Sequence, residues 1–211
     1  MSTLAVLAGA SEPQEMVVTT TVHEPAKSTG EIEVIPYNAC LDSLADRLLP
    51  WLWQKLQTDD LVDLYFPGQT QTGFATLVRM FSGDANVAMF KIAKPASDTL
   101  DAMLPGFITW TPIPMGACSI ISAGFVFFKQ WWGHGLPDAA GAAAFKFWFT
   151  QEPRIDIVLG FCPALHRLAI AYNERIGLHE IGRIPKAHLF RGKPCDAIEF
   201  AITREEWEAK A

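Results

Sequence analysis

A short segment that combines glycine, histidine and aspartate carries the clearest chemical signal in the sequence. Residues 129–145 read KQWWGHGLPDAAGAAAF, with Gly133 and Gly135 two positions apart and an alanine-rich stretch behind them. An apolar stretch precedes the glycines, so the order predicts a strand, a turn and a helix. The first backbone N–H groups of a helix lack intrahelical partners, and the helix dipole favours negative charge there. Because the glycines leave this backbone accessible, the turn predicts an anion site suited to a pyrophosphate.

A tight connection that binds nothing is the alternative interpretation, with Gly133 and Gly135 only supplying positive φ angles. Asp138 is a good N-cap residue, so the regular helix would start there, after Pro137. Its carboxylate would also repel a bound phosphate. The spacing lacks the third glycine of a dinucleotide-binding fingerprint and the G-K-[ST] of a P-loop, which excludes both of those sites.

The surrounding sequence predicts an α/β domain that would position this turn. The strand patterns are apolar runs rich in β-branched and aromatic residues, whereas the helix patterns have apolar residues at helical spacing. The expected strands are residues 31–37, 86–93, 106–113, 118–128, 154–161, 179–185 and 195–203, and the expected helices are 41–56, 72–81, 138–149, 163–176 and a short final one capped by Thr203 and Glu206. Pro50 should break or kink the first helix. The strands 118–128 and 154–161, joined by a helix, should be parallel.

Composition and charge limit the function classes. The 211 residues are 50% hydrophobic and 19% charged, which is typical of a folded domain. The net charge of -6 and the lack of a basic stripe disfavour a nucleic-acid partner. No apolar run reaches the roughly 18 residues of a membrane span, and no basic residue precedes the apolar N-terminal stretch, which argues against a secretory signal. The cysteines form no C-x-x-C pair, so we expect reduced thiols in a cytoplasmic protein and no metal site.

The chain divides into an arm and one domain. Residues 1–30 are rich in Ser, Thr, Glu and Pro without a lasting period, which predicts a flexible N-terminal arm, and residues 31–211 should form a single domain. The alanine-rich helix also carries four aromatic residues that helical spacing cannot bury on one face: Phe145, Phe147, Trp148 and Phe149. We therefore expect an exposed apolar patch, and a homo-oligomer or another protein partner held by this patch and the arm.

Two motifs resemble the signatures of the GNAT acyltransferase superfamily. Gln130-x-x-Gly133-x-Gly135 resembles the Q/R-x-x-G-x-G/A turn with which that family holds the pyrophosphate of acyl-coenzyme A (acyl-CoA). Residues 163–185 resemble its second signature, N-x-x-A-x-x-x-Y-x-x-x-G-F. The expected element order is also that of the GNAT fold, and the closing GKPCDAIEFAITREEW resembles divergent members encoded by bacteriophages.

The resemblance implies a GNAT-like fold, with a mixed, mostly antiparallel sheet of about six or seven strands flanked by helices. It implies transfer of an acyl group from acyl-CoA, normally acetyl-CoA, to an amine of unknown identity. In this family a backbone N–H of the fourth strand serves the thioester carbonyl, and this strand splays from the fifth. The implied cofactor contacts are Phe125, Phe127, Gln130, Trp132, Gly133, His134, Gly135, His166 and Asn173.

The sequence departs from the family at the catalytic positions. Asn173 stands where the family often has a tyrosine that serves as general acid, and Tyr172 comes one residue early. One residue rotates a helical side chain by about 100°, so Tyr172 should point into the core. It is the candidate catalytic residue if its hydroxyl reaches the cleft. No carboxylate or histidine lies on the fourth strand, and His134 and Asp156 are weak candidates for the base.

Trp131 and Trp132 leave a second function open. They could cover an adenine ring, pack against a partner chain, or plug the phosphate site. A plugged site would belong to a non-catalytic GNAT-like protein, such as a structural or assembly component of a phage virion. The sequence thus predicts an N-acetyltransferase, with this structural role as the alternative.

Overall fold

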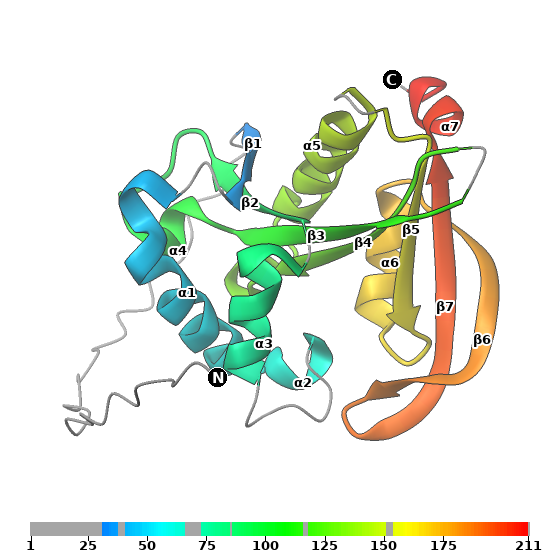
Figure 1. The fold of residues 1–211 in the computed structure, drawn as a ribbon, viewed down its shortest axis with the longest axis horizontal. Helices are drawn as coiled ribbons and strands as arrows, with labels where there is room; N and C mark the ends of the chain where they lie inside the picture. The colour runs from blue at the N-terminus through cyan, green and yellow to red at the C-terminus, as the bar shows by residue number, and fades with distance from the viewer. Residues whose placement is uncertain are drawn as a thin grey trace, which may run out of the picture.

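The structure, a computed structural model, describes residues 31–37, 41–65, 73–84, 86–115, 118–150 and 154–210, so the predicted arm lies outside the described residues. One seven-stranded sheet has the order β1-β2-β3-β4-β5-β7-β6 (Figure 1). Only the β4–β5 pair is parallel. These findings confirm the mixed, mostly antiparallel sheet and its parallel pair. The strands are β1 (Ile32–Pro36), β2 (Asn86–Ile92), β3 (Gly106–Ile113), β4 (Ile120–Phe127), β5 (Ile157–Pro163), β6 (His179–Phe190) and β7 (Lys193–Thr203).

Helices cover both faces of the sheet. They are α1 (Leu41–Thr58), α2 (Val62–Tyr65), α3 (Gly73–Arg79), α4 (Leu100–Met103), α5 (Leu136–Thr150), α6 (Arg167–Arg175) and α7 (Arg204–Glu208), with the short turns η2 (Met80–Asp84) and η3 (Lys129–Trp131). Because side chains alternate along a strand, Met89 of β2 joins a core with α1 and α3, and Phe90 joins a core with α5 and α6. No helix among the described residues is long and apolar enough to cross a membrane.

Three local expectations need correction. Pro50 does not break the first helix, because α1 continues past it to Thr58. Pro163 does not open a helix but ends β5, where its missing N–H costs no ladder bond, and α6 starts at Arg167. Asp138 is not the N-cap of α5, because the helix already begins at Leu136. The expected capping box of the last helix is confirmed, with Thr203 Oγ1 accepting a bond from the Glu206 N–H.

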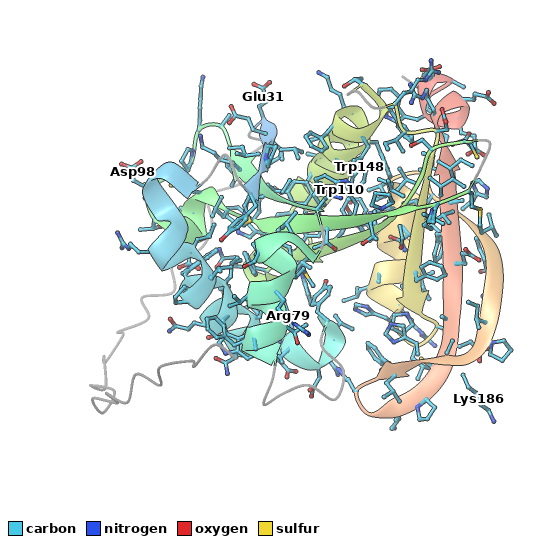
Figure 2. The ribbon with its side chains drawn as sticks, in the orientation of Figure 1. Glu31, Arg79, Asp98, Trp110, Trp148 and Lys186 are labelled. Carbon is cyan, nitrogen blue, oxygen red and sulfur yellow. The ribbon has the colours of Figure 1, made fainter. Side chains whose placement is uncertain are left out.

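The expected exposed aromatic patch on α5 is wrong. Phe145, Trp148 and Phe149 are 1%, 2% and 3% exposed. The helix is covered on more than one side, because the sheet meets Trp148 through Trp110 of β3 while α7 meets Phe149. Trp110 and Trp148 lie side by side (Figure 2), with their ring centroids 6.0 Å apart in an edge-to-face arrangement. A helix enclosed in this way can bury aromatic residues around most of its circumference.

Candidate active site

The central feature of the site is an opening between the two parallel strands. Ile120–Ala123 of β4 pair with Ile157–Gly160 of β5, and the pairing stops there. Both strands continue, β4 to Phe127 and β5 to Pro163, so their second halves diverge (Figure 1). The splay implied by the GNAT resemblance is therefore present, and it leaves one backbone edge of β4 without a strand partner.

The free edge of β4 exposes the backbone groups of Phe125 and Phe127. Tyr65 Oη donates a hydrogen bond to the carbonyl oxygen of Phe125 over 2.9 Å, and Trp132 Nε1 donates to that of Phe127 over 2.9 Å. In an extended strand the N–H and C=O of one residue point to the same side. The N–H groups of Phe125 and Phe127 therefore also face the opening, where they can donate to a bound carbonyl.

A cavity of about 340 Å³ joins this edge to the glycine turn. Its wall includes Phe125 and Phe127 at one end and Gly133 and Gly135 at the other. The two glycines have φ angles of 77° and 70°, so their predicted positive φ is confirmed. Apart from the adjacent residues of the chain, a Cβ placed on either one would meet nothing within 4 Å.

The two tryptophans occupy different environments. Trp131 is 6% exposed and belongs to the core shared by α1 and α3. Trp132 is 36% exposed, lies in the cavity wall and donates to Phe127 as described. No atom of Trp131 lies within 4 Å of the Cβ position of either glycine, and no atom of Trp132 lies within 4 Å of that of Gly135. Trp131 therefore lies away from the phosphate site, whereas Trp132 shares the cavity wall with both glycines.

Asp138, in the first turn of α5, forms an ion pair with Arg175. Arg175 of α6 donates to both carboxylate oxygens of Asp138, with Nε–Oδ2 at 3.1 Å and Nη2–Oδ1 at 3.0 Å. Both residues line the cavity beside the glycine turn. The paired guanidinium offsets the negative charge of Asp138, which reduces the repulsion that this carboxylate would exert on a phosphate.

Tyr172 lies in the wall of the cavity while most of its ring is buried. The ring packs edge-on against Phe125 and Phe127, with centroid distances of 5.6 and 5.3 Å. Its hydroxyl donates to the carbonyl oxygen of Pro137 over 3.1 Å. Burial, and to a lesser extent the carboxylate of Asp138, raise the pKa of Tyr172 well above its ordinary value, so the hydroxyl stays protonated.

The structure brings together most, but not all, of the predicted site residues. Seven line the one cavity: Phe125, Phe127, Trp132, Gly133, Gly135, His166 and Tyr172. Gln130 is directed elsewhere, since its amide accepts from Lys55 Nζ at 3.0 Å and donates to the Asp101 carbonyl at 2.7 Å. His134 and Asn173 are not among the residues that line this cavity. Within the described part of the chain, no His, Cys, Asp and Glu cluster could hold a metal ion.

Asp156 lies at the opposite, closed end of the strand pair. It precedes β5, accepts a hydrogen bond from the Ser119 N–H at 2.9 Å, and faces Arg204 of α7. This carboxylate therefore fixes the paired end of β4 and β5 and lies away from the cavity. It is no candidate for the base.

Sequence reasoning missed Tyr65 and the cation of Arg175. Tyr65 ends the short helix α2, 60 residues before its partner Phe125, and burial raises its pKa above the ordinary value. No local pattern connects these residues, so only the tertiary packing could reveal the contact. Arg175 could have been suspected, because it is the basic residue in the last turn of the helix that carries Tyr172.

A second cavity of about 520 Å³ adjoins the first. Four residues line both cavities: Leu64, Trp132, His166 and Leu168. Among the described residues, His166 is the one titratable side chain common to both. Its ring lies 5.1 Å from that of Phe190, and burial together with the charge of Arg191 lowers the pKa of this histidine.

Comparison with known proteins defines the fold class. No family model matches the sequence, and no curated protein is similar to it. Solved structures do match. A GNAT-family acetyltransferase from Bacillus anthracis shares 16% identity with a TM-score of 0.60, over 83% of this chain and 96% of that chain. Spermidine N-acetyltransferase from Vibrio cholerae, in complex with CoA and spermine, shares 12% identity with a TM-score of 0.65, over 84% and 98%. The chain therefore has the GNAT fold.

Proposed function

We propose that the chain is an acyl-CoA-dependent N-acyltransferase that uses acetyl-CoA and an amine acceptor. The observation that carries this proposal is one continuous cavity between the free edge of β4 and the open glycine turn. A thioester joined to a pyrophosphate by an extended arm matches these two ends. The fold it shares with known acetyltransferases supports the same conclusion.

The cofactor contacts follow from the cavity wall. The diphosphate would bind at Gly133 and Gly135, where the first turn of α5 presents backbone N–H groups. The pantetheine would pair with the backbone of Phe125 and Phe127 in place of a neighbouring strand. Tyr65 now satisfies the Phe125 carbonyl, and because a carbonyl has two lone pairs it can accept a second donor.

Acyl transfer requires a bond exchange and two proton movements. The amine nitrogen attacks the thioester carbon, a C–N bond forms, and the C–S bond breaks to release the CoA thiolate. The N–H groups of β4 that face the opening stabilise the oxyanion in the tetrahedral intermediate. The amine gives up a proton to a base, the thiolate takes one from an acid, and the products are an amide and free CoA.

The geometry favours His166 as the base and Tyr172 as the acid. His166 lies where the two cavities meet, and its lowered pKa keeps the imidazole neutral and able to accept a proton near pH 7. Tyr172 keeps its proton, as a donor must, and its hydroxyl would leave the Pro137 carbonyl to reach the thiolate. Such rearrangement is common, since catalytic hydrogen bonds often form only in the substrate complex.

Calorimetric titration with acetyl-CoA tests the proposal. The wild-type chain should bind the cofactor, and Gly133→Trp should weaken binding at least tenfold by filling the space beside the turn. Gly83→Trp is the matched control, because Gly83 also has a positive φ of 130° and nothing within 4 Å of its Cβ position, yet does not line the cavity. A folded wild-type chain that does not bind acetyl-CoA would overturn the assignment and favour the structural alternative.

A further inference from the structure

The second cavity is lined by charges of both signs. Two carboxylates come from the α1–α2 connection and α2, Asp60 and Asp63. Three cations come from three other segments: Lys129 follows β4, Arg167 starts α6, and Arg191 lies in the β6–β7 turn. These five side chains are exposed, and none forms an ion pair with another described residue. The charges therefore remain available to a ligand.

Two residues with positive φ angles lie at the same cavity. Asp60 and Arg191 have φ angles of 53° and 50°, in the left-handed region that few residues other than glycine adopt. Only one other described residue that is not glycine shares this conformation, Lys186. Asp60 and Arg191 both lie at chain reversals: Asp60 follows α1, where the Leu61 N–H donates to the Leu56 carbonyl, and Arg191 forms the two-residue β6–β7 turn with Gly192. These two chain reversals place one carboxylate and one guanidinium in the wall of a single cavity.

The position of the cavity relates it to the acyl-transfer site. Its charged part continues into the first cavity past His166 and Trp132. The two elements that supply charges from far apart in the sequence, α2 and the β6–β7 turn, lie along the same lower edge of the molecule in Figure 1. A ligand bound among these charges would therefore extend past His166 toward the opening between β4 and β5.

We propose that the second cavity binds the amine acceptor, and that this acceptor carries an anionic group, as an α-amino acid does. Its amine would lie next to His166, where the two cavities meet, and its anionic group would bind Arg167 and Arg191. Leu165 and Leu168 supply apolar surface for the remainder. A polyamine, which has only positive charges, would be repelled by the three cations. The volume of about 520 Å³ is ample for a ligand of this size.

This inference rests on the proposed function, and its test measures acceptor binding and cofactor binding separately. Calorimetric titration of the full chain, first without cofactor, would use leucine, leucine methyl ester and spermidine. Leucine carries a negatively charged carboxylate, which its methyl ester lacks. Leucine should bind at least tenfold more tightly than the ester or spermidine. The double variant Arg167→Gln/Arg191→Gln should lose that tenfold advantage, whereas Arg79→Gln, an exposed arginine of α3 labelled in Figure 2, should keep it.

A second arm distinguishes the acceptor from the cofactor as the source of the anion. The 3′-phosphate of CoA could also bind these arginines, so the double variant is titrated with acetyl-CoA and acetyl-dephospho-CoA. An unchanged affinity for leucine, together with weaker binding of acetyl-CoA only, would overturn the inference. Equal binding of ester and acid, or tighter binding of spermidine, would also overturn it. Leucine binding without any acetyl-CoA binding would support the dipolar site and overturn the transferase.

Discussion

The two cavities that meet at His166 are built from different parts of the fold. The first is walled by the core aromatic residues Phe125 and Phe127 of β4 and Tyr172 of α6, whose ring packs edge-on against both. The second is walled by exposed charges from turns and helix ends. Side chains of the first cavity therefore stabilise the domain, whereas those of the second are free to vary with the ligand. A common cofactor and a variable acceptor would suit this division.

The largest effect is expected where α5 and α6 touch behind the first cavity. A Cβ at Gly141 would lie 2.7 Å from Ile176 Cγ2 and 2.9 Å from Tyr172 Oη. Gly141→Val should therefore lower the free energy of unfolding by about 1–3 kcal/mol through overpacking. Urea denaturation measures the loss. The control is Gly182→Val, because a Cβ there meets only Glu199 Oε2 at 3.7 Å. Equal stability of the two variants would contradict the close packing described.

The next effect concerns the two tyrosine hydroxyls of the first cavity. Tyr172→Phe removes the bond to Pro137, so the free energy of unfolding should fall by about 1 kcal/mol. If Tyr172 is also the acid, kcat should fall at least about tenfold. Tyr65→Phe removes the comparable bond to Phe125 and should leave kcat within a few-fold. A larger kcat loss in Tyr65→Phe would transfer the role of acid to Tyr65.

The pH dependence of the rate tests whether His166, which lies where the two cavities meet, is the base. Because burial and Arg191 lower the pKa of His166, the neutral base should persist below the usual value of 6.5. We therefore expect kcat/KM to fall only as the pH drops through this lowered pKa. Arg191→Gln removes one of the two causes, so the break should move to higher pH, and His166→Gln should abolish it. A break unaffected by both substitutions would exclude His166 as the base.

The smallest effect is expected in the second cavity. Arg167→Gln removes an exposed charge that forms no ion pair with the described residues. The free energy of unfolding should change by less than about 0.5 kcal/mol, which thermal or urea denaturation can check. A loss comparable to that of Gly141→Val would mean that the second cavity is as much a part of the core as the first.

Local sequence patterns were sufficient to predict the secondary-structure elements and the glycine turn. Alternating and helical spacing located the seven strands, and the glycine pair indicated positive φ angles and an accessible helix start. The boundary that failed at Pro163 depends on where β5 stops pairing with β7, whereas α5 begins at Leu136 with a local bond from the Ala139 N–H to the Gly135 carbonyl. The β5–β7 pairing cannot be read from a single segment, because it joins residues that are distant in the sequence.

The sequence by itself determined where the strands lie along the chain, where the glycine turn lies, and the resemblance to an acyl-CoA-binding fold. Each of these depends on residues that are neighbours in the sequence. Only the tertiary structure decided which side chains meet. It buried the α5 aromatics, directed Gln130 to Lys55 and away from the cavity, and placed Tyr65 on the Phe125 carbonyl. The physical reason is that burial and hydrogen-bond partners come from packing between distant segments, which the spacing along one segment does not encode.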